Sequence, residues 1–249
     1  MDLTWHTLAI LAVVALVAGF VDTLAGGGGL LTLPALLLAG VSPLAALGTN
    51  KLQSSFGTGM ASFQVLRRKR VTWAQVRWPM LFAFCGSTAG AIAIQWVNTD
   101  RLSMMIPVVL GVIAAYFLFV PRAHHPPAEP RIGEVTFRAA VVPAIGAYDG
   151  AFGPGTGSLF ALTGVALRGT PLVESTAIAK TLNFSTNVAS LLVFLVVGHL
   201  VWIAGAVMIG GQLVGAYAAS HVLFRVKPLV LRVLIVVMSL GMLVRVLVG

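Results

Sequence analysis

Long apolar segments follow one another along almost the whole chain, and they constrain the fold more than any other feature. They occupy roughly residues 5–25, 30–39, 44–66, 76–96, 102–120, 139–152, 158–167, 174–197, 201–223 and 229–247. Most approach the roughly 20 residues that an α-helix needs to cross the hydrocarbon core of a bilayer. Only 9% of the residues are charged, whereas a soluble domain has about a quarter. The segments therefore predict an all-α integral membrane protein.

The basic residues are concentrated between the apolar segments. The formal net charge is +9, and two dense clusters are "RRKR" at 67–70 and "FRVK" at 224–227. Lys and Arg in short loops mark the cytoplasmic side of a membrane protein. This distribution favours a lipid bilayer as the partner and argues against nucleic acid. The spacing of the His residues predicts no metal site, and no motif predicts a cofactor.

Two glycine clusters each precede an apolar segment that is too short to span a bilayer. "GFVDTLAGGGG" begins at Gly19 and "GAYDGAFGPGTG" begins at Gly146, so Asp22 matches Asp149 at an offset of 149 − 22 = 127. Further matches share an offset of 129, for example 180 − 51: Lys51 with Lys180, Trp73 with Trp202, Gly86 with Gly215 and Leu102 with Leu231. The ordered matches predict two repeats, residues 1–120 and 138–249, joined by a polar linker at 121–137.

Loop charges give the two repeats opposite orientations. In the first repeat, the basic loop "RRKR" is followed by the nearly neutral "VNTDR"; in the second, the uncharged "VGHL" is followed by the basic "FRVKP". Under the positive-inside rule, equivalent loops then lie on opposite sides of the membrane. Inverted repeats are a common transporter design, with the substrate site between the halves near the bilayer midplane.

Opposite orientation requires an odd number of full crossings in each repeat. Three long helices supply them if the first helix and the short segment after it form a re-entrant hairpin, which gives about eight membrane helices in all. The basic loop and the linker are then cytoplasmic, and both termini lie outside. In the alternative the first helix crosses fully, but the short segment would then have to cross with only about 15 Å of helix.

The glycine clusters predict a break in the helix at membrane depth. Such a break leaves backbone N–H groups without partners, which is tolerated only inside protein or against a cavity. Helices starting after the clusters would direct N–H groups and positive dipole ends at that cavity, which favours anions. The alternative is close helix packing or a hinge. Paired clusters favour the ligand interpretation, with the candidate contacts Gly27, Gly28, Gly29, Gly155, Thr156 and Gly157.

The clear ionisable residues at membrane depth are one Asp and one Lys in each repeat. Charges at this depth are costly, and they usually pair with one another or mark a substrate path. Lys51 shares a helix face with Ser54 and Ser55, and Lys180 shares one with Asn183. We expect each ammonium to lie beside hydroxyl or amide groups that form an oxyanion site, or alternatively to form a structural ion pair with an Asp. The candidate polar ligands are Asn50, Lys51, Gln53, Ser54, Lys180, Asn183 and Asn187.

The two acidic residues, Asp22 and Asp149, stand just before the glycine turns. A carboxylate in such a place is expected to hold backbone N–H groups of the turn or to fix a neighbouring Lys. Proton coupling during transport is the alternative role.

At these residues the sequence resembles the TauE/SafE family of sulfite exporters, also called the TSUP family. The resemblance rests on "DTLAGGGGLLTLPALLLAGVSPLAALGTNKLQSSFGT", on "GAYDGAFGPGTGSLF", and on "AIAKTLNFSTNVAS" followed by "W", and it covers nearly the whole chain. It implies movement of sulfur-containing anions such as sulfite, sulfoacetate or related organosulfonates across the bacterial inner membrane. Asn50 corresponds to Ala179 in the second repeat, so the halves are expected to share a ligand unequally.

We therefore expect a multi-pass inner-membrane transporter that binds a small anion between the repeats and rocks one repeat against the other. A passive anion channel and a carrier of another small organic anion, such as a carboxylate, are the alternatives. An enzyme is disfavoured because the sequence has no His-rich, Cys-rich or triad arrangement.

Overall fold

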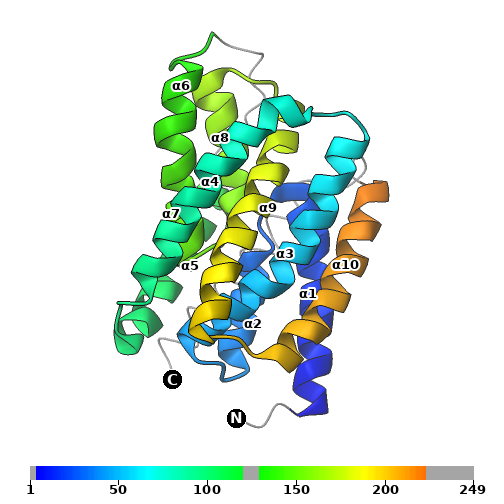
Figure 1. The fold of residues 1–249 in the computed structure, drawn as a ribbon. Coiled ribbons are helices and arrows are strands. Elements are labelled where there is room, and N and C mark those ends of the chain that lie inside the picture. The colour runs from blue at the N-terminus through cyan, green and yellow to red at the C-terminus, as the bar shows by residue number, and fades with distance from the viewer. Residues whose placement is uncertain (1–3, 120–128, 223–249) are drawn as a thin grey trace.

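The computed structural model describes residues 4–119 and 129–222, which form a bundle of helices (Figure 1). The elements are α1 (Trp5–Ala25), α2 (Gly29–Leu38), α3 (Pro43–Arg67), α4 (Trp73–Ile94), α5 (Thr99–Phe119), α6 (Glu134–Thr136), the π-helical turn η1 (Phe137–Val141), α7 (Val142–Ala151), α8 (Thr156–Arg168), α9 (Leu172–Val197) and α10 (Trp202–Val222). The described residues contain no strand, and the all-α prediction is confirmed. The apolar segment at 229–247 lies outside them.

Local sequence explains several helix ends. α3 begins with Pro43 in its first turn, where the missing N–H is not needed. Before α4, the Thr72 N–H donates to the Gln75 side-chain oxygen at 2.7 Å, as in a capping box. α8 and α9 stop at Gly169 and Gly198, whose φ angles of 63° and 82° are left-handed. α6, η1 and α7 run on without a gap from 134 to 151, so this helix starts inside the predicted linker.

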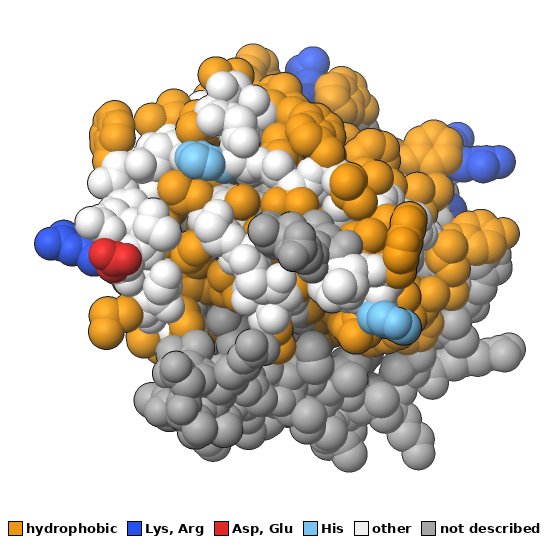
Figure 2. Space-filling view, turned by 90° about the horizontal axis from the view of Figure 1, so that it is seen from below, with side chains coloured by type: hydrophobic (Ala, Val, Ile, Leu, Met, Phe, Trp, Pro, Cys, Tyr) orange, Lys and Arg blue, Asp and Glu red, His pale blue; other side chains and the backbone are white. Residues whose placement is uncertain are grey.

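The described bundle buries many polar groups beside its apolar core, and it also exposes large apolar side chains. Lys51, Asp149 and Gln53 are buried, whereas large apolar side chains such as Val196 and Met104 are exposed. In the end-on view from below, hydrophobic side chains are mixed with uncharged polar and backbone atoms, and the few Lys and Arg side chains visible there lie at the rim (Figure 2). Buried charges together with many exposed large apolar side chains are unusual in a soluble protein, and they fit a lipid surround.

Three helices in the described part of the chain are long and apolar enough by themselves to cross a membrane: Trp5–Leu24, Leu172–Val197 and Trp202–Ala219. α3, α4 and α5 have 25, 22 and 21 residues, which is the length that a span requires. The middle of α3 is polar and buried, which lowers its hydropathy without shortening it. The predicted number of spans stays a prediction.

The short helices form two hairpins. α1 rises from the lower end of the molecule in Figure 1 and α2 runs back toward that end, whereas α6 to α7 descends from the upper end and α8 turns back. α1 packs along α10, and α7 packs along α4. Glycines bring these backbones together, since a Cβ added to Gly215 or Gly90 would stand only 1.9 Å from a carbonyl oxygen of the partner helix. The hairpins therefore place both glycine clusters in the interior.

Candidate functional site

The two glycine turns touch each other in the middle of the bundle. α1 ends at Gly26, whose φ is 76° and whose N–H donates to the Asp22 carbonyl at 2.8 Å. Gly153 and Gly155, before α8, have φ angles of 97° and 82°. A Cβ on Gly26 would lie 2.8 Å from the backbone carbon of Gly157. Glycine is required here both for the left-handed conformation and for the close approach of the two backbones.

A small cavity of about 10 Å³ lies between the turns, which is room for roughly one water molecule. α2 and α8 both begin at this cavity, so two positive helix ends face it. The first and second halves of the chain both contribute to its wall, which is lined by Asp22, Gly26, Gly29, Asn50, Ser54, Thr58, Gly153, Gly155, Asn183 and Asn187.

Hydrogen bonds on α3 orient the Asn50 carboxamide. Its Oδ1 accepts from Thr32 Oγ1 at 2.5 Å and from Gln53 Nε2 at 2.9 Å. With the oxygen held in this way, the NH₂ group lies toward the glycine turns, 3.6 Å from where a Cβ on Gly29 or Gly153 would stand. Gln53 Oε1 is buried without a partner among the described residues, an arrangement that is uncommon in a folded interior. The Asn50 NH₂ group is therefore the donor that α3 offers at the turns, and a donor suits an anion.

α9 supplies the amide groups of the second half, at positions that differ from that of Asn50 in the first. Asn187 Nδ2 donates to the Asn183 carbonyl at 2.8 Å and lies 3.4 Å from Asn183 Oδ1. The Asn183 NH₂ group lies 3.3 Å from where a Cβ on Gly157 would stand. Ser87 of α4 donates to the Thr186 carbonyl at 2.7 Å and ties α9 to α4. Each long helix beside the cavity thus directs one asparagine NH₂ group at a glycine turn.

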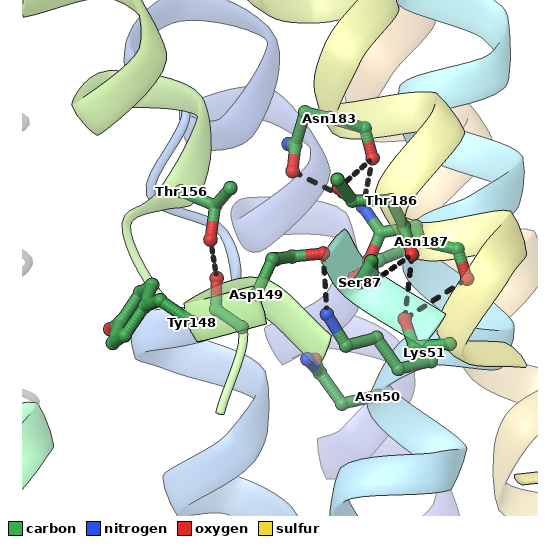
Figure 3. A network of polar contacts seen from close by, with 12 residues as sticks. Asn50, Lys51, Ser87, Tyr148, Asp149, Thr156, Asn183, Thr186 and Asn187 are labelled. Atoms are coloured by element: carbon green, nitrogen blue, oxygen red, sulfur yellow. Dashed lines mark hydrogen bonds and ion pairs between the residues drawn. The ribbon is translucent and has the colours of Figure 1, made fainter. Parts of the chain in front are cut away.

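Lys51 forms an ion pair across the two halves. Its Nζ lies 2.8 Å from Asp149 Oδ2 on α7, and both side chains are 1% exposed. Figure 3 shows the lysine and the aspartate pointing toward each other, with Asn50 beside them. The predicted alternative of a structural ion pair is therefore present for Lys51. Ser55, which was expected beside the ammonium, donates instead to the Lys51 carbonyl at 2.7 Å.

Lys180 is held differently. Its Nζ donates to the backbone carbonyl of Asp22, while the Asp22 carboxylate accepts the Gly28 N–H at 3.0 Å. The expected support of the glycine turn by a carboxylate thus appears at Asp22. The Gly28 N–H points at this carboxylate and not at a ligand.

Lys51, Lys180 and Asp149, described above, are not among the residues that line the central cavity. The other predicted site residues divide into two groups. Those that line the cavity are Asp22, Gly29, Asn50, Ser54, Gly155, Asn183 and Asn187. The others support it: Gly27 and Gly28 build the first turn, Thr156 Oγ1 donates to the Gly153 carbonyl at 2.7 Å, Gly157 packs on Gly26, and Gln53 orients Asn50. Sequence reasoning did not single out Gly26, Thr32, Thr58 and Gly153. Thr58 stands four residues after Ser54, so the helical spacing contained the signal for it.

Known proteins resemble the chain along most of its length. The family model "Sulfite exporter TauE/SafE" matches residues 11–246. A probable membrane transporter protein of Haemophilus influenzae is 39% identical over 242 residues, which cover 97% of this chain and 95% of that protein. A probable membrane transporter protein of Sinorhizobium, ORF9, is 40% identical over 99% of this chain and 94% of its own length. Escherichia coli K12 YfcA, also a probable membrane transporter protein, is 40% identical over 93% of this chain and 86% of its own length.

No solved structure matches the chain. The family match and these bacterial relatives confirm the resemblance seen in the sequence motifs, and they identify a multi-pass membrane protein that is a transporter and not an enzyme. The chain belongs to the TauE/SafE sulfite exporter family of membrane transporters.

Proposed function

We propose that this transporter moves a small sulfur-containing anion, such as sulfite, sulfoacetate or a related organosulfonate, across the bacterial inner membrane. The observation that carries the proposal is the cavity between the two glycine turns. Two helix N-termini and the asparagines at positions 50 and 183 direct positive ends and N–H donors at it. Oriented backbone and amide donors of this kind bind oxyanions.

The proposal includes an architecture of two inverted repeats, residues 1–120 and 138–249, with the 121–137 linker on the cytoplasmic side. It is supported by the hairpins of α1–α2 and α7–α8, which enter the bundle from opposite ends. It is also supported by equivalent packing, because α1 lies on α10 as α7 lies on α4. A twofold design of this kind is suited to alternating access around a fixed central site.

The central cavity is too small for the proposed substrate in this conformation, because about 10 Å³ admits one water and no sulfonate. Transport therefore requires the two turns to separate. The pair between Lys51 and Asp149 and the bond from Lys180 to Asp22 are the contacts that join α3 to α7 and α9 to α1 at this level.

Uptake into proteoliposomes tests the proposal. We expect saturable flux of sulfite or sulfoacetate by the wild-type protein and by Lys69→Ala, since Lys69 is exposed in a loop. Lys51→Ala and Lys180→Ala are expected to lose most of this flux. Wild-type flux in both of these variants would overturn the assignment.

Further measurements on the purified protein distinguish the proposed function from the two alternatives, a passive anion channel and a carboxylate carrier. A passive channel would give a flux that rises linearly with concentration and shows no exchange of internal for external anion. A carboxylate carrier would show thermal stabilisation by acetate or malonate and none by sulfite or sulfoacetate, because a ligand raises apparent stability only where it binds.

A further inference from the structure

A second and larger cavity opens at the end of the molecule where the basic loop lies. Its volume is about 310 Å³, which is within the range of small-molecule sites. It is enclosed by the end of α1, the last turns of α3 and the first turns of α9. Arg68 and Arg70 stand at its edge and are exposed, whereas Lys180 lines it and is buried. No acidic side chain is among its described lining residues.

The large cavity and the central cavity are separated by the end of α1. Thr23 and Leu24 line the large cavity, and the neighbouring Asp22 lines the small one. Lys180 Nζ donates to the Asp22 carbonyl at this boundary. An ion moving between the two cavities therefore has to pass the contact between Lys180 and the end of α1.

The walls between the charged ends are mainly apolar. Val65 of α3 and Leu172, Val173 and Ala177 of α9 line the cavity together with the arginines and the lysine, and Thr23, Gln64 and Thr176 are the uncharged polar side chains among the lining residues. An inorganic oxyanion would lose more hydration against such walls than these few polar groups replace. An anion with a short carbon chain can place its charged group at a cation and bury its carbon atoms.

We propose that this cavity is the vestibule through which an organic anion with a short apolar chain, such as an alkanesulfonate, enters from the basic-loop side. Arg68 and Arg70 raise the local concentration of the anion. The contact between Lys180 and Asp22 closes the way to the central site. This inference rests on the proposed function, since it supplies the route to the same site.

Thiol labelling tests the vestibule independently of transport. Cys85 is the chain's single cysteine and is exposed, so Cys85→Ser gives a cysteine-free background. Thr176→Cys, or Val173→Cys if the first variant folds poorly, places one thiol in the cavity wall. The labelling rates of the anionic 2-sulfonatoethyl and the cationic 2-trimethylammonioethyl methanethiosulfonates are then compared.

We expect the anionic reagent to be favoured, and Arg68→Gln/Arg70→Gln to reduce that preference about tenfold, as expected for a cleft lined by one sign of charge. The matched control is Arg67→Gln/Lys69→Gln, which removes the same charge from the same loop at positions that do not line the cavity. An equal loss in both double variants, or an unchanged preference in Arg68→Gln/Arg70→Gln, would overturn the vestibule.

Protection experiments test the chemistry of the ligand. We expect 1-propanesulfonate to slow labelling, and sulfate and 1-propanol not to. Equal protection by sulfate would contradict the apolar requirement, and protection only by phosphatidylglycerol in nanodiscs would assign the cavity to a lipid headgroup. Sulfonate flux is measured on the same variants. Normal sulfonate flux with no anion preference in labelling would contradict the vestibule alone. Absence of sulfonate flux in the wild-type protein would contradict the proposed function.

Discussion

The two buried lysines occupy equivalent places in the sequence but have different partners. Lys51 meets a carboxylate, Asp149, side chain to side chain. Lys180 meets a carbonyl, that of Asp22, whose carboxylate is occupied by a backbone N–H of the turn. The first arrangement pairs two buried charges side chain to side chain. In the second, the ammonium bonds to a backbone carbonyl at the boundary between two cavities, and the Asp22 carboxylate acts on it only through space. We therefore propose a mainly structural role for Lys51 and an anion contact for Lys180.

The largest expected effect is on stability and falls on Lys51. Lys51→Met leaves Asp149 buried without its cation, which costs about 3–5 kcal/mol. Lys180→Met should cost only about 1 kcal/mol, because the Asp22 carbonyl keeps its bond from the Gly26 N–H. Thermal unfolding in detergent measures both.

A double variant provides the control for this comparison. Lys51→Met/Asp149→Leu removes the unpaired charge and should recover most of the lost stability. Equal melting temperatures for Lys51→Met and Lys180→Met would contradict the claim that Lys51 stabilises the fold more than Lys180 does.

The glycine turn gives the next largest effect. Gly26→Ala introduces a Cβ 2.8 Å from backbone atoms of the second turn at a φ of 76°, which adds overpacking of about 1–3 kcal/mol to the backbone strain. Gly40→Ala has the same strain, with φ 79°, but no atom within 4 Å. Its cost should be only about 1–2 kcal/mol. Chemical or thermal unfolding of both variants isolates the contact between the turns, and equal losses would mean that the contact contributes nothing.

The smallest expected effect on stability is that of Asp22→Asn. The carboxamide oxygen can still accept the Gly28 N–H, so the loss should stay within about 1 kcal/mol. Because Asp22 lines the central cavity, this variant also tests the alternative of proton coupling. Transport whose rate loses its dependence on pH in Asp22→Asn would support that role, and an unchanged pH profile would exclude it.

The sequence predicted the helices and the position of the site well, for physical reasons. Apolar runs are continuous in a lipid-facing helix, so their boundaries at α1, α3 and α9 lie within two residues of the expected ones. The glycine clusters indicated both helix breaks because few other residues adopt a φ near +80°. Helical spacing likewise grouped Lys180 with Asn183 on one face of α9.

An ion pair between a lysine and an aspartate was among the alternatives, but which aspartate pairs with which lysine could not be predicted in this way. The pairing of Lys51 with Asp149 joins α3 to α7 across 98 positions, as 149 − 51 gives, and no local spacing contains that distance. Ser55 was placed beside the ammonium by helical periodicity, but the long Lys51 side chain extends away toward α7. The use of the Asp22 carbonyl, and not its carboxylate, follows from the backbone path of the turn, which residue types alone do not specify.

The most direct test of the account is sulfoacetate flux through Lys180→Met, compared with Lys69→Met as the exposed matched variant and with the wild type. The thermal unfolding of both variants is measured first. Lys69→Met should unfold as the wild type does, and Lys180→Met should show only the small loss of stability expected above. We predict that Lys69→Met transports at the wild-type rate and that Lys180→Met, although folded, loses at least about nine-tenths of it, which corresponds to an activation free energy that is higher by roughly 1.4 kcal/mol. Wild-type flux through a folded Lys180→Met protein would contradict it.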